Sequence, residues 1–137
     1  MSAGMGQAWR ERLQIRLQEA WDRRDREEYE WILELIRLHE WIKLQELADQ
    51  TAARWGIPRA DFRDCIACSN WDPHSQREFE PGKVGVGLGH LTPDVARYFG
   101  LVVNDEVDER YDPAKNLEAL AGYITSMELW RGEVTCH

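Results

Sequence analysis

Cysteine and histidine are the side chains in this sequence that most readily bind a metal or carry redox chemistry. Cys65 and Cys68 are three residues apart, and the sequence closes on Cys136 and His137. On a helix the first pair shares one face, and with the second pair it would make a Cys3His zinc site. A thioredoxin-like redox pair is disfavoured, because no βαβ pattern surrounds it. We expect neither metal nor cofactor, and two reduced, mostly buried thiols at 65 and 68.

These residues must be positioned by helices, because apolar residues recur at helical spacing along much of the chain. We predict helical segments over residues 7–28, 29–54, 59–69, 93–99 and 113–130. Gly56 and Pro58 end the second segment, and Thr92 and Pro93 start the fourth. We read residues 74–86 and 103–112 as polar and acidic loops. No alternating strand pattern exceeds about four residues, so we expect an all-α or nearly all-α fold.

The first two helical segments differ in character from the rest of the chain. The mixed-charge run 22–28 is expected on a solvated helix face or at a helix junction. Segment 29–54 has neighbouring apolar stripes, so part of it could face another protein chain instead of its own core. Five of the seven tryptophans fall at or before position 55, and aromatic anchors dominate protein interfaces.

Length and charge exclude several classes of protein. The chain has 137 residues, about one domain, and no run long and apolar enough for a transmembrane helix. Its net charge of −8 argues against binding to nucleic acids or anionic membranes. Residues 1–56 hold 9 Lys+Arg and 11 Asp+Glu, and residues 57–137 hold 8 and 14. Residues 1–16 lack the apolar core of a Sec signal, so we expect synthesis in the cytoplasm without Sec export.

Four segments, in order, resemble the lytic transglycosylase module of the lysozyme-like superfamily. ADQTAARWGIP at 48–58 is similar to the family's helix ending in a "yGv(d/p)" turn, and CIACSNWDP at 65–73 to its "AI(x)xES(x)FdP" segment. GLGHLTPDVA at 87–96 is similar to "GLmQlmPxtA", and YDPAKNLEALAGYI at 111–124 to "fDPxxNixaGaxYL". GLGH also resembles the GxGH turn of phage-type endolysins, which belong to the same superfamily.

The resemblance implies a lysozyme-like helical module over residues 44–137, preceded by a helical arm or hairpin over residues 1–43. It also implies recognition of a peptidoglycan glycan strand by Ser69, Gly87, His90 and Tyr123. His90 replaces the usual Gln, and we weigh a role in the cleft equally against a role in fixing the loop. For Tyr123 the alternative is an ordinary core position.

The sequence departs from the family at the catalytic acid. Cys68 stands where the family has its Glu, and a thiol is a poor proton donor for cleaving a glycosidic bond. Glu78 and Glu80 could supply the acid instead, and partial burial of Glu80 beside Phe79 and Pro81 would raise its pKa. Asp64 and Asp72 are weaker candidates. The alternative for all four acids is an ordinary surface or capping position.

We therefore expect a phage-associated protein of lysozyme-like fold, catalytically impaired, that serves as a structural or binding component of a virion or assembly. Its tryptophan-rich N-terminal helices would contact a protein partner, and the protein would be oligomeric or part of a larger assembly. One alternative is an active transglycosylase or muramidase that uses Glu80 or Glu78. Another is an intracellular regulator that binds a protein, since a fold alone does not fix function.

Overall fold

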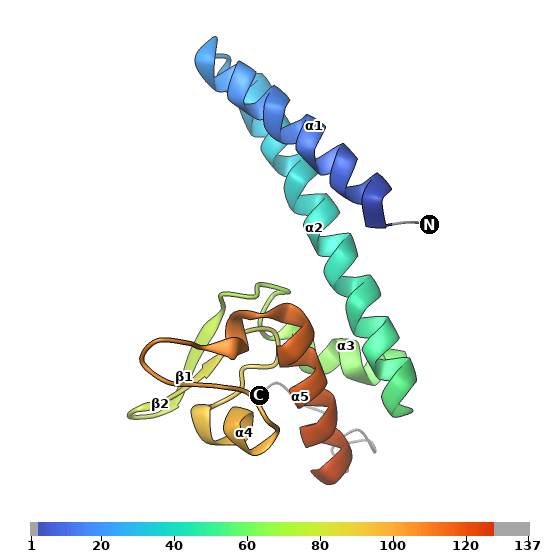
Figure 1. Cartoon of the computed structure of the whole chain (residues 1–137), viewed down its shortest axis with the longest axis vertical. Coiled ribbons are helices and arrows are strands. Elements are labelled where there is room, and N and C mark those ends of the chain that lie inside the picture. Colours follow the sequence, from blue (N-terminus) through green and yellow to red (C-terminus); the bar gives the residue numbers. More distant parts are fainter. Residues whose placement is uncertain (1–2, 128–137) are drawn as a thin grey trace. The chain divides into compact units, whose positions relative to one another are not determined.

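The computed structural model describes residues 3–127, and within them the chain is mostly helical (Figure 1). Its elements are α1 (Ala3–Asp22), α2 (Arg26–Trp55), α3 (Arg59–Ala67), β1 (Gln76–Glu80), β2 (Lys83–Val86), α4 (Pro93–Tyr98), the short 3-10 helix η1 (Glu109–Tyr111) and α5 (Pro113–Met127). The prediction of an all-α or nearly all-α fold is thereby confirmed. The chain divides into two compact units, Met1–Lys43 and Leu44–His137.

The first unit is a helical hairpin of α1 and the beginning of α2. Its small core consists of Leu13, Ala20 and Ile32, with partly buried Leu17, Tyr29, Leu35 and Ile36 packed against them. Among the described residues, no helix is both long and apolar enough to cross a membrane.

The break between the first two helices lies earlier than the predicted boundary at residue 28. Arg24 adopts a left-handed backbone conformation (φ 56°), and the amide of Asp25 donates to the carbonyl of Ala20 at 2.9 Å, which closes α1. The side chain of Asp25 accepts a hydrogen bond from the amide of Glu28 at 3.2 Å, and Asp25 thereby acts as the N-cap of α2. Both signals sit inside the mixed-charge run, which is therefore a helix junction.

The second unit has a hydrophobic core larger than that of the first unit. The end of α2, together with α3 and α5, supplies most of its buried apolar residues: Ala48, Ala52, Phe62, Cys65, Ile66, Leu117, Leu120, Ala121 and Ile124. Gly56, with φ 70°, ends α2 as predicted. Helix α4 starts at Pro93 with Thr92 as its N-cap residue, although the Thr92 side chain makes no capping bond. The predicted end of the last helix near residue 130 lies outside the described residues.

A β-hairpin occupies the segment 74–86, where we predicted a loop, so that prediction is wrong. Strands β1 and β2 pair antiparallel, with Glu80 opposite Lys83. The Pro81-Gly82 turn joins them, and Gly82 has the positive φ (81°) that the third position of a type II turn requires. Every residue of β1 is exposed. The strand therefore has no buried face, and its sequence lacks the apolar alternation by which strands are recognised.

Candidate functional site

The second unit contains a pocket of about 360 Å³, within the size range of small-ligand sites. Residues from the β-hairpin, the following turn, the start of α4, and α5 line it: Phe79, Glu80, Lys83, Gly89, His90, Leu91, Thr92, Val95 and Tyr123. Three of the residues singled out from the sequence, Glu80, His90 and Tyr123, therefore meet at one pocket.

The turn that follows β2 forms one wall of this pocket. Val86 and Leu91 exchange two backbone hydrogen bonds, of 3.0 and 3.1 Å, across its base. Gly87 (φ 83°) and His90 (φ 48°) both have left-handed backbone conformations, and the amide of His90 donates to the carbonyl of Gly87 at 3.1 Å. A non-glycine residue at positive φ is uncommon, so the surroundings of His90 must hold it there.

Asn116, on α5, ties the turn to the core. Its Nδ2 donates to the carbonyls of Val86 (3.0 Å) and Arg110 (2.9 Å), and its Oδ1 accepts from the amide of Gly89 (2.9 Å). The Asn116 side chain is fully buried. Water therefore does not supply these hydrogen bonds, and the side chain satisfies the buried backbone groups instead.

Arg110, in η1, supports the turn from its other end. This side chain is only 7% exposed, and its Nη1 donates to the carbonyls of Val84 (2.9 Å) and Leu91 (3.0 Å). Its Nε and Nη2 donate to both carboxylate oxygens of Asp108, at 2.9 and 2.7 Å. These hydrogen bonds hold the pKa of Asp108 below its ordinary value. A buried guanidinium with this many partners is a rigid support.

His90 is connected both to the pocket and to the loop. It is one of the residues that line the pocket, and its Nε2 lies 2.6 Å from Oγ of Ser75, with which it shares a hydrogen bond. The carbonyl of Ser75 also accepts from the amide of Gly87 at 2.9 Å. The segment before β1 and the turn after β2 are thus tied together at this side chain.

Two of the residues that line the pocket are aromatic. Phe79, on β1, is 41% exposed, and the guanidinium carbon of Arg77 lies 5.1 Å from its ring centroid. Tyr123, on α5, is partly buried and meets the ring of Phe99 edge-on, at 6.2 Å between centroids. Tyr123 is thus neither fully in the core nor free on the surface.

The two candidate acids are both exposed on β1. Glu80 lines the pocket and pairs with Lys83 at 3.4 Å, and its side chain is 66% exposed. The burial beside Phe79 and Pro81 that we expected for Glu80 is therefore absent. Glu78 is exposed and is not among the pocket residues. Asp64 is also exposed, and Asp72 accepts from the amide of His74 at 2.9 Å, a capping role.

The end of α3 carries the position where the resemblance expects the acid. Cys68, the C-cap residue of α3, is disulfide-bonded, so the expectation of reduced thiols at 65 and 68 is wrong for Cys68. Cys65 is free and buried, and burial raises the pKa of its thiol to about 12. Ser69 is buried as well, and its hydroxyl donates to the carbonyl of Ile66 at 2.6 Å. Neither Ser69 nor Gly87 is among the residues that line the pocket, and Gly87 belongs to the turn beside it.

The zinc option loses a ligand, because a disulfide sulfur is not a thiolate. Within residues 3–127 no group of three or more His, Cys, Asp or Glu side chains could hold a metal ion. Cys136 and His137 lie outside the described residues.

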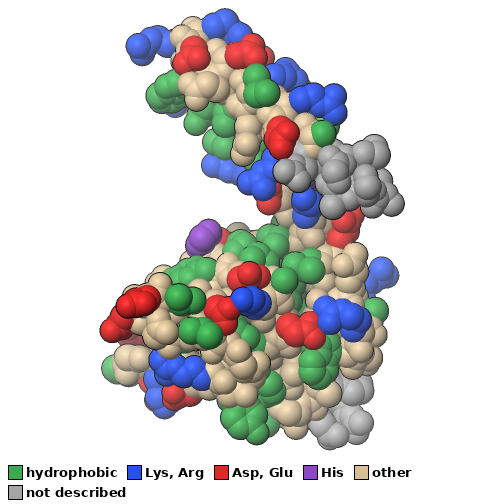
Figure 2. All heavy atoms as spheres, viewed as in Figure 1, with side chains coloured by type: hydrophobic (Ala, Val, Ile, Leu, Met, Phe, Trp, Pro, Cys, Tyr) green, Lys and Arg blue, Asp and Glu red, His purple; other side chains and the backbone are tan. Residues whose placement is uncertain are grey.

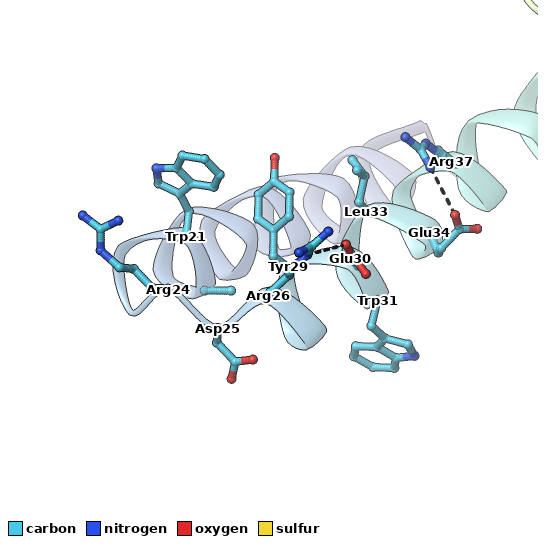
Figure 3. Close-up of a pocket in the computed structure, with 11 residues that line it drawn as sticks. Trp21, Arg24, Asp25, Arg26, Tyr29, Glu30, Trp31, Leu33, Glu34 and Arg37 are labelled. Carbon is cyan, nitrogen blue, oxygen red and sulfur yellow. Dashed lines mark hydrogen bonds and ion pairs between the residues drawn. The ribbon is translucent and has the colours of Figure 1, made fainter.

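A second pocket, of about 720 Å³, lies on the first unit near the junction of α1 and α2 (Figure 3). Its large apolar lining residues are Trp21, Tyr29, Trp31 and Leu33, and the ion pairs Arg26–Glu30 and Glu34–Arg37 lie along α2 (Figure 3). The rings of Trp21 and Tyr29 are 5.3 Å apart. Its large aromatic side chains are of the kind that is enriched at protein interfaces.

Several residues that build the first pocket were not singled out from the sequence. Lys83 and Phe79 come from the unpredicted hairpin, and Thr92 was interpreted only as a helix cap. Arg110 and Ser75 contact the turn although they are distant from it in sequence, and no local sequence pattern predicts these contacts.

No family model matches the chain, and no curated protein or solved structure is significantly similar to it.

Proposed function

We propose that the second unit binds a glycan strand of the peptidoglycan type without cleaving it, and that the first unit attaches it to another protein chain. The observation that carries the proposal is the composition of the 360 Å³ pocket, which has aromatic and polar side chains but no buried carboxyl group. Cleavage of a glycosidic bond needs a proton donor, and enzymes raise the pKa of that group by burial.

The pocket has the parts that a sugar requires. Phe79 and Tyr123 offer ring surfaces to the apolar faces of a pyranose, and His90, Thr92 and Lys83 offer hydrogen-bonding groups. Asn116 and Arg110 fix the turn, so the His90 side of the pocket is organised before a ligand binds. Pre-organisation of this kind lowers the entropic cost of binding.

Binding is tested by sedimenting the full chain with purified peptidoglycan sacculi and measuring the fraction of protein that remains bound. We expect saturable binding that falls roughly tenfold in Phe79→Ala or Tyr123→Leu, if each ring contributes about 1.4 kcal/mol. Tyr98→Ala is the matched control, because Tyr98 is 81% exposed on α4 and does not line the pocket. An affinity equal in all four proteins would refute the pocket as the glycan site.

The second candidate is the active transglycosylase or muramidase, and the observation that favours it is that Glu80 lines the same pocket as His90 and Tyr123. Chromatography of the soluble products distinguishes the two functions. The binding proposal expects no released muropeptides from wild type. Release that disappears in Glu80→Gln and persists in Glu78→Gln would establish catalysis by Glu80. The virion role expected from the sequence stays a prediction.

A further inference from the structure

One side of α2 in the first unit carries an apolar stripe that the hairpin itself leaves uncovered. Trp31, Leu35, Leu38 and Ile42 follow one another at intervals of four, three and four residues, the spacing with which helices pair in coiled coils. Leu35 packs against the hairpin core. Trp31, Leu38 and Ile42 are 54%, 52% and 43% exposed. Within the described part of the unit, Leu35 is thus the packed residue of the stripe, and its other three side chains are exposed.

The stripe borders the pocket on the same helix, because Trp31 is one of the residues that line that pocket. Tyr29 and Leu33 also line it, and they point to one side of α2 whereas Trp31 points to the other (Figure 3). The hairpin has only three fully buried apolar residues, and chains of roughly 40 residues usually need an additional source of stability such as association. Covering the stripe would supply that stability.

The charges beside the stripe form two rows of opposite sign. On the α1 side, the Arg16 guanidinium carbon lies 5.6 Å from the Trp31 ring, and Arg12 is one turn away. Arg16 also pairs with Glu28 at 3.5 Å. Glu28 comes three residues before Trp31 and therefore lies on the same border of the stripe as Arg16.

The acidic row lies on the other side of the stripe. Glu27 and Glu34, four residues before and three after Trp31, project there by helical geometry. Both are exposed, and Glu34 also pairs with Arg37 at 3.1 Å. The apolar stripe thus has Arg12 and Arg16 on one border and Glu27 and Glu34 on the other.

This order of charges selects one way for the surface to pair with itself. A two-fold axis parallel to the helices places the basic row of each copy opposite the acidic row of the other. An antiparallel two-fold pairing places like charges opposite each other, which is unfavourable. We infer that the stripe Trp31, Leu35, Leu38 and Ile42 binds the same stripe of a second copy of this chain, in a parallel arrangement with Arg12 and Arg16 facing Glu27 and Glu34.

The hairpin face that carries the stripe is near the lower end of the size range of specific protein interfaces. The 20 residues of α1 span about 30 Å, and two packed helices are roughly 20 Å wide. The face thus offers roughly 600 Å² per copy, near the roughly 800 Å² per partner of a standard interface. The inference does not depend on what the second unit binds.

Sedimentation equilibrium of the full chain between about 1 and 100 μM tests the pairing. We expect the mass of two chains at the upper end, and at least a tenfold weaker association in Leu38→Glu. Ile15→Glu is the matched control, because Ile15 is 60% exposed and lies on the side of α1 opposite Leu13 and Leu17. A wild type with the mass of one chain at 100 μM overturns the inference, and so does equal weakening by the two substitutions.

A charge exchange tests the parallel arrangement. The variant Glu27→Lys with Glu34→Lys has two basic borders, and Arg12→Glu with Arg16→Glu has two acidic ones. We expect each variant alone to have the mass of one chain and their equimolar mixture to have the mass of two, with helix content by circular dichroism kept in both. A mixture that stays at the mass of one chain, or variants that each pair as wild type does, would refute the arrangement.

Discussion

The side-chain oxygen of Asn116 accepts a hydrogen bond from the backbone amide of Gly89 at 2.9 Å, so a single residue of α5 fixes the middle of the turn beside the pocket. The same side chain donates to the carbonyls of Val86 and Arg110. A helix that belongs to the core is thus bonded directly to the backbone that presents His90. The stability of the second unit and the shape of its pocket therefore depend on the same bonds.

Replacing Asn116 by Ala should lower the free energy of unfolding by about 2–4 kcal/mol, because two carbonyls and one amide lose a buried partner. Urea denaturation followed by circular dichroism measures this. Asn104→Ala is the matched control. The Asn104 side chain likewise bonds to the backbone, because it accepts hydrogen bonds from the amides of Glu106 and Val107, but it is exposed. Water can replace its bonds, so we expect a loss of at most about 1 kcal/mol. Equal losses in both variants would contradict the role assigned to Asn116.

Gly87 and Gly82 allow backbone strain to be separated from packing. Both have positive φ, 83° and 81°, so a change to Ala costs each roughly 1–2 kcal/mol of backbone strain. A Cβ on Gly87 would also lie 2.3 Å from Nδ2 of Asn116 and 2.4 Å from the carbonyl oxygen of Arg110, whereas one on Gly82 meets nothing within 4 Å.

Gly87→Ala should therefore be the more destabilising change by at least 2 kcal/mol, roughly the cost of an overpacked core. Thermal unfolding of the two variants gives the comparison directly. If their midpoints fall equally, the tight packing of the turn against α5 has no energetic consequence.

Asp108 should make the stability of the second unit depend on acid pH. Hydrogen bonds from Arg110 lower its pKa in the folded protein below the value of about 3.9 in the unfolded chain. A depressed pKa means that the pair stabilises fully above about pH 4–5, and that this stability is lost as the pH falls through the folded value.

Asp108→Asn should therefore be less stable than wild type at pH 7, by about 2 kcal/mol because Arg110 is buried. The difference should shrink as the pH falls below 4. Asp105→Asn, a change at an exposed position in the same loop, is the control. It should leave the free energy of unfolding equal to that of wild type at both pH 7 and acid pH. A difference between wild type and Asp108→Asn that stays constant from pH 7 to pH 2 would contradict this linkage.

Local signals in the sequence were enough to place most helices of the second unit. Gly56 ends α2 and Pro93 begins α4 because the preferences of glycine and proline act on their own backbone. The hairpin was missed because β1 is exposed on both faces, so its residues carry no pattern of burial. The boundary of α1 was misplaced because an arginine, Arg24, takes the left-handed position that glycine or asparagine usually occupies.

The candidate site was predictable only in part, for a related reason. His90 lies beside two glycines, and Tyr123 lies on a clear helix, so both could be named before their neighbours were known. The burial of Ser69 depends on packing, and the disulfide of Cys68 depends on a contact that spacing on one helix does not reveal. The exposure of Glu80 follows from the hairpin that the sequence did not predict.

Cys65 should be chemically inert in the folded protein. It is 2% exposed, and burial, with the nearby carboxylates of Asp64 and Asp61, raises the pKa of its thiol to about 12. Against a reference pKa of about 8.5, the thiolate fraction at pH 8 falls by roughly three orders of magnitude, and only the thiolate reacts with alkylating reagents.

Labelling with iodoacetamide at pH 8, followed by mass spectrometry of the peptides without reduction, measures this reactivity. We expect Cys65 to stay unlabelled in buffer and to react within minutes in guanidinium chloride. Ala67→Cys introduces a thiol at an exposed position of the same helix and should react in both conditions. Rapid labelling of Cys65 in buffer would mean that α3 opens locally, because a thiol sealed in the core can react only after the packing of Phe62 and Ile66 around it is lost.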